Sequence, residues 1–410
     1  MAISPTLAIN NLTKERLTKG LPTFKLGFGQ SPFPVPEILR KELQDHAHVK
    51  DYLHSQGLLE LREKISVYYH RRFGIESIAR NIIVGPGSKE LLFLTQLILN
   101  RELILPKPSW VSYAPQANLL NNATHWLNTS EDNNWNLSAE ELDSFLASQS
   151  GTSKHLIILN YPNNPTGKSY KEEELIRISE VARKYDLVII SDEIYGEFDF
   201  KARHISIAKY YPEGTIVCSG LSKWCGAGGW RLGYMIFPDS MNEELQALIS
   251  AASECYSCAS APIQYASIKA FENGPEIQRY TEVCRKILIK AHETVINTID
   301  KSMINVFPAD GGFYVFLNFK PEYFPFDSSK ELCERLLNDT GVALLPGSSF
   351  GCKDDFLSAR LAFVDIPEID FDQILSDPKL LDQEGNAFFN SLKNAIFSIN
   401  NWSLINLPNK

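Results

Sequence analysis

The stretch that decides the fold class is Leu187-Val188-Ile189-Ile190-Ser191-Asp192-Glu193-Ile194-Tyr195. Its apolar part shows no alternation of polar and apolar residues, which is typical of a strand buried on both faces. Further short apolar runs, all candidate strands, occupy residues 82–84, 102–105, 155–159, 215–219 and 233–237. Helical patterns occupy residues 89–99, 138–148, 171–185 and 241–251. Strands that alternate with helices predict an α/β fold with a mostly parallel sheet flanked by helices.

The two ends of the chain differ from this central pattern. A long helical pattern at residues 276–300 is followed by strand-like runs at residues 313–319, 342–345 and 358–364. This mixture indicates a smaller α+β domain, with which the N-terminal segment is expected to pack. The predicted division is a large domain at residues 46–289 and a small domain made of residues 1–45 plus 290–410.

Composition excludes several classes of protein. The chain has 410 residues, of which 44% are hydrophobic, and a net charge of −9. That charge argues against a nucleic-acid partner, because phosphate binding needs a basic surface. No apolar run approaches the roughly 18–20 residues that span a bilayer, so no membrane partner is expected. Residues 1–20 lack the apolar stretch of a signal peptide.

The cysteines indicate a reducing compartment and no metal site. Seven cysteines are an odd number at low density, which favours free thiols in a cytoplasmic protein. Cys255 and Cys258 form a lone C-x-x-C pair without a second pair or a nearby histidine. Zinc sites need three or four ligands, so the sequence predicts no bound metal.

Side chains suited to a cofactor follow five of the predicted strands. They are a glycine turn at residues 85–89 that leads into a helix, then Trp110, Asn164, Asp192 and Lys223. Each has a plain structural explanation when it is taken alone. The carboxyl ends of parallel strands meet at one edge of a sheet, where ligands bind, so the coincidence predicts a binding site. A carboxylate that closes a buried strand, as Asp192 does, is expected to need a cationic partner.

The order of these motifs resembles the class I/II aminotransferases. The resemblance is carried by Asn164-Pro165-Thr166-Gly167, Asp192-Glu193-Ile194-Tyr195, Ser222-Lys223 and Gly229-Trp230-Arg231-Leu232-Gly233-Tyr234, and it extends over nearly the whole chain. It implies a fold-type I enzyme that depends on pyridoxal 5′-phosphate. No complete nucleotide-binding fingerprint competes with this interpretation.

The resemblance also implies roles for individual residues. Lys223 would form a Schiff base with the cofactor and later move the substrate's α-proton, which makes it catalytic together with Asp192 and Tyr195. Asp192 would hold the protonated ring nitrogen, so that the ring accepts electrons. Tyr195 and Asn164 would hydrogen-bond the 3′ oxygen of the ring, and Trp110 would stack on it.

The same resemblance implies a phosphate site and a dimer. Arg231, Ser88, Lys89 and the backbone at Gly87 would bind the phosphate. Tyr52 would reach the phosphate in the neighbouring subunit, so the resemblance implies a homodimer with shared active sites.

One position departs from the family pattern. Many relatives carry a serine three residues before the lysine as a phosphate ligand, whereas this chain has Gly220. Ser219, Ser222 and Lys89 are the candidate replacements.

The substrates implied are an amino acid and a 2-oxo acid that exchange an amino group by a ping-pong mechanism. Arg360 would bind the α-carboxylate, because guanidinium offers two parallel donors. Asn164 would line the substrate site, and Gly29 would leave room for the carboxylate.

Two other functions are alternatives to transamination. One is a lyase on the same fold, either a C–S β-lyase or an ACC synthase-like enzyme. The other is a transcriptional regulator with an aminotransferase-like domain, which needs a DNA-binding helix-turn-helix; only about 20 residues precede Leu21, too few for that module.

Substrate choice is expected to be broad. Residues 239–270 contain no arginine, so a partner-supplied arginine for a distal carboxylate is not expected there. Lys89 offers a less selective cation, and Phe28, Tyr113 and Trp110 would form an apolar wall. We therefore expect neutral or aromatic amino acids as donors, with glutamate and 2-oxoglutarate tolerated.

Overall fold

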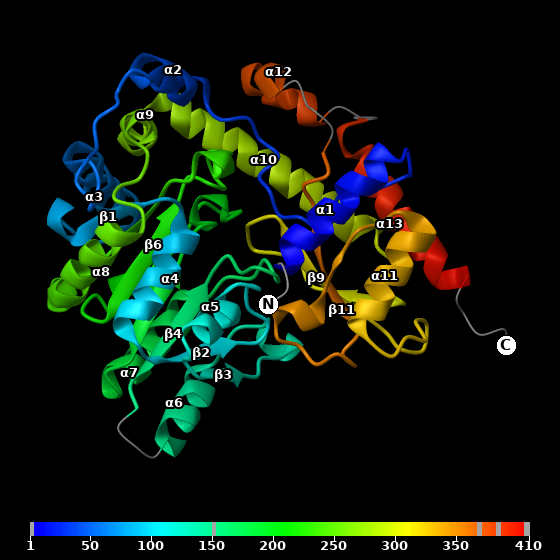
Figure 1. Cartoon of the computed structure of the whole chain (residues 1–410). Helices are drawn as coiled ribbons and strands as arrows, with labels where there is room; N and C mark the ends of the chain where they lie inside the picture. The colour runs from blue at the N-terminus through cyan, green and yellow to red at the C-terminus, as the bar shows by residue number, and fades with distance from the viewer. Residues whose placement is uncertain (1–3, 150–152, 367–370, 383–386, 406–410) are drawn as a thin grey trace.

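The computed structural model describes residues 4–149, 153–366, 371–382 and 387–405 (Figure 1). Within them, the larger sheet has seven strands in the order β1-β7-β6-β5-β4-β2-β3. Six strands share one direction, and β7 runs antiparallel to both of its neighbours, β1 and β6. The strands are β1 Ile82–Gly85, β2 Glu102–Pro106, β3 Thr124–Leu127, β4 His155–Asn160, β5 Val188–Asp192, β6 Thr215–Gly220 and β7 Gly233–Ile236. The predicted α/β fold with a mostly parallel sheet is confirmed.

Helices cover both faces of this sheet. On one face, Leu156 and Ile158 of β4 pack with α4 (Ser88–Leu99), α5 (Tyr113–Leu119) and α8 (Asn242–Cys255). On the other face, Ile157 and Leu159 pack with α6 (Ala139–Ser148) and α7 (Glu172–Lys184). Successive residues of a strand point to opposite faces, so a strand covered on both sides must be apolar throughout.

The edge strand β3 was not predicted from the sequence. It reads Thr124-His125-Trp126-Leu127, and its first three residues are only partly buried. A strand with one free edge and polar residues lacks the continuous apolar run by which the central strands were found. The helices α1 (Pro5–Thr18), α3 (Leu59–Phe73), α5 and α9 (Ala261–Glu272) were not expected either.

The smaller sheet is antiparallel, in the order β10-β11-β9-β8. Its strands are β8 Ile304–Val306, β9 Tyr314–Phe319, β10 Leu345–Pro346 and β11 Ser358–Ala362. The helices α11 (Ser329–Thr340), α12 (Phe371–Ser376) and α13 (Asn390–Ile405) belong to this C-terminal part. The N-terminal segment joins it, because Phe24 forms a β-bridge with Val342.

The predicted domain division remains a prediction. The long helix α10 (Pro275–Thr298) crosses the predicted boundary at residue 290 (Figure 1). The helix α2 (Glu37–His46) crosses the other predicted boundary, between residues 45 and 46, and packs on α9, where His46 stacks on Tyr265 with ring centroids 5.0 Å apart. None of the helices in the described residues is both long and apolar enough to cross a bilayer.

A close approach of backbone segments joins β7 to the start of α4. A Cβ atom on Gly233 would overlap the backbone nitrogen of Ser88 and lie 2.5 Å from the carbonyl carbon of Gly87. Only glycine permits this approach, which brings the turn after β6 next to the turn after β1.

We predict that Gly233→Ala destabilises the protein by about 2 kcal/mol, because the added methyl meets backbone atoms that cannot rotate away. Urea unfolding followed by circular dichroism at fixed protein concentration measures this change. The control is Gly229→Ala in the same turn, where a Cβ atom meets nothing within 4 Å. Equal stability of the two variants would contradict the close-approach argument.

Candidate active site

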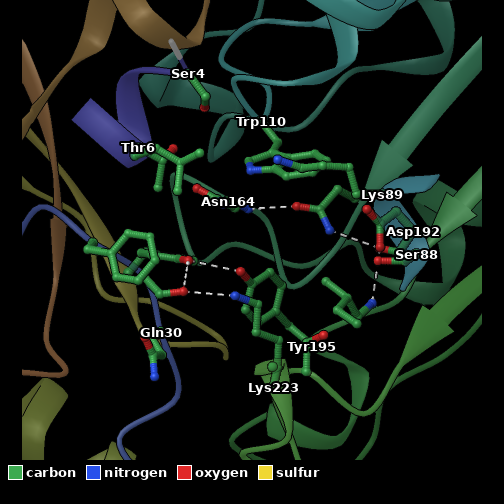
Figure 2. A pocket seen from close by; sticks show the side chains of 18 of the residues that line it. Ser4, Thr6, Gln30, Ser88, Lys89, Trp110, Asn164, Asp192, Tyr195 and Lys223 are labelled. Atoms are coloured by element: carbon green, nitrogen blue, oxygen red, sulfur yellow. Dashed lines mark hydrogen bonds between the residues drawn. The ribbon is translucent and has the colours of Figure 1, made fainter. Parts of the chain in front are cut away.

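A cavity of about 470 Å³ lies at the carboxyl ends of the parallel strands, between the two sheets. Most of the predicted site residues line it, as Figure 2 shows for several of them. The predicted residues among its walls are Gly29, Ser88, Lys89, Trp110, Asn164, Asp192, Tyr195, Ser222, Lys223, Arg231 and Arg360. The structure therefore brings together side chains that span more than 300 positions of the sequence.

Lys223 lies in the turn that follows β6. Its ammonium nitrogen donates a hydrogen bond to the carbonyl oxygen of Gly29 at 2.8 Å. Burial and, to a smaller extent, the positive charge of Arg360 lower the pKa of Lys223 to about 7, although Asp192 acts in the opposite direction. A large fraction of this amine is therefore neutral near pH 7, which a nucleophilic lysine requires.

Asp192 ends β5 and is 4% exposed. Its carboxylate accepts a hydrogen bond from the Tyr113 hydroxyl at 2.6 Å and one from the Ile194 backbone N–H at 3.3 Å. Burial raises the pKa of Asp192 to about 6, although both hydrogen bonds act to lower it. The carboxylate is thus held by neutral donors in a cavity wall, where a bound cation would complete its environment.

Tyr113 has a different role from the one expected. The sequence placed its ring in an apolar wall, but its hydroxyl group is turned toward Asp192. A tyrosine buried among apolar residues needs a partner for its hydroxyl, and a carboxylate is a strong acceptor.

Gly29 makes room for another tyrosine. A Cβ atom at this position would overlap the hydroxyl group of Tyr314, which lies 2.9 Å from the Tyr195 hydroxyl. The space beside Gly29 is therefore occupied by Tyr314, and the expected role of Gly29 toward a carboxylate remains a prediction.

Arg360 on β11 is 1% exposed, and its guanidinium lines the cavity. It donates to the Asn164 side-chain oxygen at 2.9 Å and to the Gly27 carbonyl at 2.6 Å. Its Nε atom has no hydrogen-bond partner among the residues that the structure describes. A buried guanidinium with neutral partners and an unused Nε–H donor is suited to bind a carboxylate.

Positive charge gathers at another wall of the cavity. Ser88 and Lys89 begin α4, whose N-cap Gly87 provides no side-chain cap. Arg231 has a left-handed backbone (φ 56°), and its guanidinium occupies the space that a side chain on Gly87 would fill. Burial and the nearby Arg231 lower the pKa of Lys89. Within the described ranges, neither cation forms an ion pair with a carboxylate, so the wall is suited to an anion.

The structure accounts for the glycine at position 220. A Cβ atom there would lie 2.7 Å from the Leu232 carbonyl oxygen, so the backbone that leads into β7 leaves no room for serine. The neighbouring Ser219 is buried and donates to the Glu193 carbonyl at 3.4 Å, whereas Ser222 lines the cavity. Of the two serines that flank Gly220, Ser222 is thus the one placed to meet a ligand.

Tyr52 lies apart from the other predicted site residues. It is 88% exposed and is not among the residues that line the cavity of its own chain. Its predicted contact with a partner's phosphate is therefore not available within one chain and remains a prediction.

Several cavity residues were missed by sequence analysis. Asn160, one of them, donates a hydrogen bond to the Asp192 carbonyl at 2.9 Å, and Tyr314 is another. The start of α1 also reaches the cavity, through Ser4, Thr6 and Leu7. Tyr314 belongs to a family-like Gly-Gly-Phe-Tyr run that could have indicated it, but nothing in residues 4–7 indicates a place at the site.

These walls fit pyridoxal 5′-phosphate. The cavity combines a buried amine that is partly neutral, a buried carboxylate, and a wall with two cations that form no ion pair within the described residues. Trp110 adds an aromatic surface at the same cavity, with the Lys89 ammonium 5.0 Å from its ring centroid. Such a set is suited to an enzyme that uses this cofactor.

Comparison with known proteins gives the family. A family model described as aminotransferase class I and II matches residues 22–370, so the chain belongs to the class I/II aminotransferases. It is 32% identical to the asparagine–oxo-acid transaminase of Streptococcus mutans over 87% of this chain and 91% of the relative. It is also 32% identical to an aspartate aminotransferase of Bacillus subtilis, over 89% and 93%.

A solved structure supports the same conclusion. The aspartate aminotransferase of Thermus thermophilus with maleate superposes with a TM-score of 0.82 at 26% identity, covering 93% of this chain and 97% of that one. The chain is a pyridoxal-phosphate-dependent aminotransferase, and the lyase alternative is not retained, because these relatives are named as transaminases.

We predict that Tyr113→Phe raises the pKa of Asp192 above about 6, because the lost hydrogen bond stabilises the ionised carboxylate. Less of the carboxylate is then ionised at pH 7, so the acid limb of the kcat/KM profile moves to higher pH. A hydrogen bond to a charged group contributes about 1.5–3 kcal/mol, which corresponds to roughly one to two pKa units, so we expect kcat/KM at pH 7 to fall about two- to fifteenfold.

Tyr69→Phe is the matched control for this experiment. It removes another buried hydroxyl, which contacts Tyr234 at 3.1 Å and lies outside the cavity. An acid limb that stays in place in Tyr113→Phe, or that moves equally in both variants, would contradict the assignment.

Proposed function

We propose that Lys223, Asp192 and Tyr195 are the catalytic residues of this aminotransferase. The observation that carries the proposal is the buried Lys223 amine, with its pKa lowered to about 7, in one cavity with the buried Asp192 carboxylate. When bound, pyridoxal 5′-phosphate supplies an aldehyde that captures amines and a ring that accepts the electrons of a substrate carbanion.

Residues of the protein are proposed to transfer the substrate proton and to hold the cofactor ring. The neutral Lys223 amine accepts and returns the α-proton of the amino acid, because its pKa lies near the working pH. The Asp192 carboxylate keeps a proton on the ring nitrogen, and the Tyr113 hydroxyl holds that carboxylate in place. Asn164 and Tyr195 are proposed to bind the ring oxygen, with Trp110 against the ring face.

The phosphate is proposed to lie at the positive wall of the cavity. Arg231, Ser88 and Ser222 line this wall, and the uncapped N-terminus of α4 at Gly87 adds backbone donors. Lys89 shares the wall, and its charge serves both the phosphate and the distal part of the substrate.

Arg360 is proposed to bind the α-carboxylate shared by all donors. Its burial next to Asn164 and Gly27 fixes the direction of its free donors, which orients the α-carbon relative to Lys223. The distal part of the substrate then meets a mixed surface. Phe28 and Leu7 are apolar, whereas Lys89 carries the positive charge.

We propose broad donor specificity for this site, covering neutral and aromatic amino acids and, through Lys89, acidic ones. Relatives of this chain are named as transaminases of asparagine and of aspartate. These two amino acids have the same shape and differ in charge, so a comparison of their kcat/KM values tests how the site responds to a distal negative charge.

The enzyme is proposed to work as a homodimer with shared active sites. Tyr52 supports this proposal, because an 88% exposed tyrosine in a family-like segment is available to the cavity of a second chain. We also propose a cytoplasmic location, which agrees with free cysteines throughout the described part of the chain.

An isolated heterodimer of Tyr52→Phe and Lys223→Ala subunits tests both the catalytic lysine and the shared site. One of its cavities then combines a normal Lys223 with the partner's normal Tyr52, and the other lacks both groups. We expect Lys223→Ala homodimers to be inactive and the heterodimer to regain about half of the wild-type rate per dimer at limiting cofactor.

The alternatives give different rates. A heterodimer with half the activity of the Tyr52→Phe homodimer would mean that sites are not shared. Near wild-type turnover in Lys223→Ala homodimers would refute the role of the lysine.

Lys89→Gln tests the proposed specificity. We expect the wild-type kcat/KM for aspartate to exceed that for asparagine by less than about 100-fold, because lysine lacks the paired donors of arginine. In the variant, the ratio of kcat/KM for aspartate to kcat/KM for asparagine should fall about tenfold, because one ionic contact is lost. The kcat/KM for phenylalanine should change little. Saturating cofactor removes any effect on phosphate binding, and an unchanged ratio would contradict the role of Lys89.

A further inference from the structure

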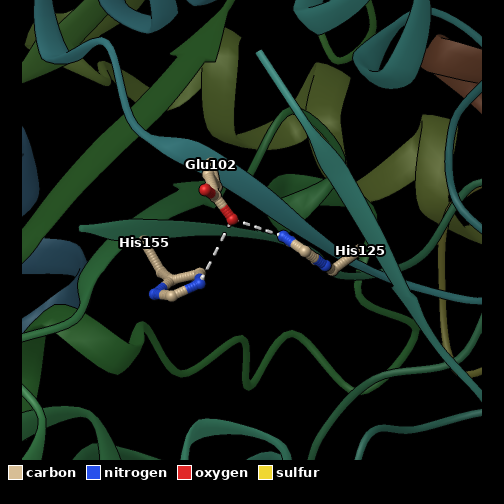
Figure 3. A group of neighbouring side chains, drawn as sticks. All are labelled: Glu102, His125 and His155. Carbon is tan, nitrogen blue, oxygen red and sulfur yellow. Dashed lines mark hydrogen bonds and ion pairs between the residues drawn. The ribbon is translucent and has the colours of Figure 1, made fainter. Parts of the chain in front are cut away.

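Three potential metal ligands meet outside the catalytic cavity. Glu102 is the first residue of β2, His125 lies on β3, and His155 is the first residue of β4. Figure 3 shows the carboxylate between the two imidazole rings. None of the three lines the active-site cavity, which lies at the opposite ends of these strands.

The ligand atoms are close enough to share one ion. The Glu102 carboxylate lies 2.6 Å from Nε2 of His125 and 3.6 Å from Nε2 of His155, and all three ligand atoms fall within 4.8 Å of one another. Ligands of a tetrahedral Zn²⁺ ion lie about 3.4 Å apart, given bonds of about 2.1 Å. Small side-chain rotations therefore convert this arrangement into a coordination site.

His155 is the observation that points to a ligand. Its side chain is 8% exposed, and its Nε2 atom is buried without a hydrogen bond in the described part of the chain. Buried polar atoms are normally paired, so an unpaired nitrogen that faces a carboxylate and a second imidazole requires an explanation.

The other two ligands leave a route to solvent. Their side chains are 33% exposed for Glu102 and 29% for His125, so an ion and a water molecule can reach the cluster. The ring of Phe145 lies against both imidazoles, with centroids at 5.2 and 5.9 Å, and forms an apolar wall.

We propose that Glu102, His125 and His155 bind one divalent transition-metal ion of the Zn²⁺ type, with water as the fourth ligand. Two imidazoles and one carboxylate suit ions of intermediate softness, such as Zn²⁺, better than Mg²⁺ or Ca²⁺, which prefer oxygen ligands. The site joins the edge strand β3 to β2 and β4, so the bound ion stabilises this end of the sheet.

Metal titration of the holoenzyme after chelator treatment tests the proposal. Co²⁺ should give saturable visible absorption bands at one ion per chain, and Zn²⁺ should displace it. We expect Glu102→Gln and His155→Gln to weaken Zn²⁺ binding, measured by calorimetry, by at least about 100-fold, since each removes a direct ligand. Zn²⁺ should raise the Tm of the wild type and not that of either variant.

His70→Gln is the matched control, because His70 pairs with Glu76 at 2.8 Å on the surface without a third ligand. It should bind the ion as the wild type does. The Tm values measured without metal establish that each variant is folded. His125→Asn is a further variant that removes the third proposed ligand.

Two results would overturn the proposal. One is wild-type protein that shows no saturable Co²⁺ bands and no calorimetric binding. The other is binding that survives in the ligand variants but is lost in Cys255→Ser, which would assign the ion to an exposed thiol.

Discussion

A carboxylate buried at the end of a fully apolar strand is the constraint on which this active site depends. Asp192 is buried there, and the hydrogen bonds that it accepts from Tyr113 and the Ile194 N–H in the described part of the chain come from neutral donors. The pKa of this group, raised to about 6, expresses the cost of that burial. A cationic ring nitrogen compensates the carboxylate charge. Burial therefore destabilises the ionised form of the free Asp192 and strengthens its interaction with a bound cofactor.

The second constraint is the distance between the two sheets. Arg360 belongs to the small antiparallel sheet, yet it donates to Asn164, which follows β4 of the large sheet. Lys223 likewise donates to Gly29 of the N-terminal segment. These bonds define the distance between the proposed substrate anchor and the proposed catalytic amine, and that distance must be short and constant for proton transfer.

The same strands carry different chemistry at their two ends. At the carboxyl ends of β4 and β5, Asn160 and Asp192 are register partners beside the cavity. At the amino ends of β2 and β4, Glu102 and His155 are also register partners, and His125 of β3 joins them. Pairing between strands thus sets which distant residues become neighbours at each edge.

The sequence by itself determined the α/β class, the six apolar strands and most of the residues that line the cavity. Continuous apolar runs and their order are local properties, and the motifs at the strand ends follow from them. Only the tertiary structure decided that Tyr113 holds Asp192, that Tyr314 fills the space at Gly29, and that α1 reaches the cavity. It also placed Tyr52 outside its own cavity and gathered Glu102, His125 and His155. These relations join residues far apart in the chain through packing and strand register, which no local pattern encodes.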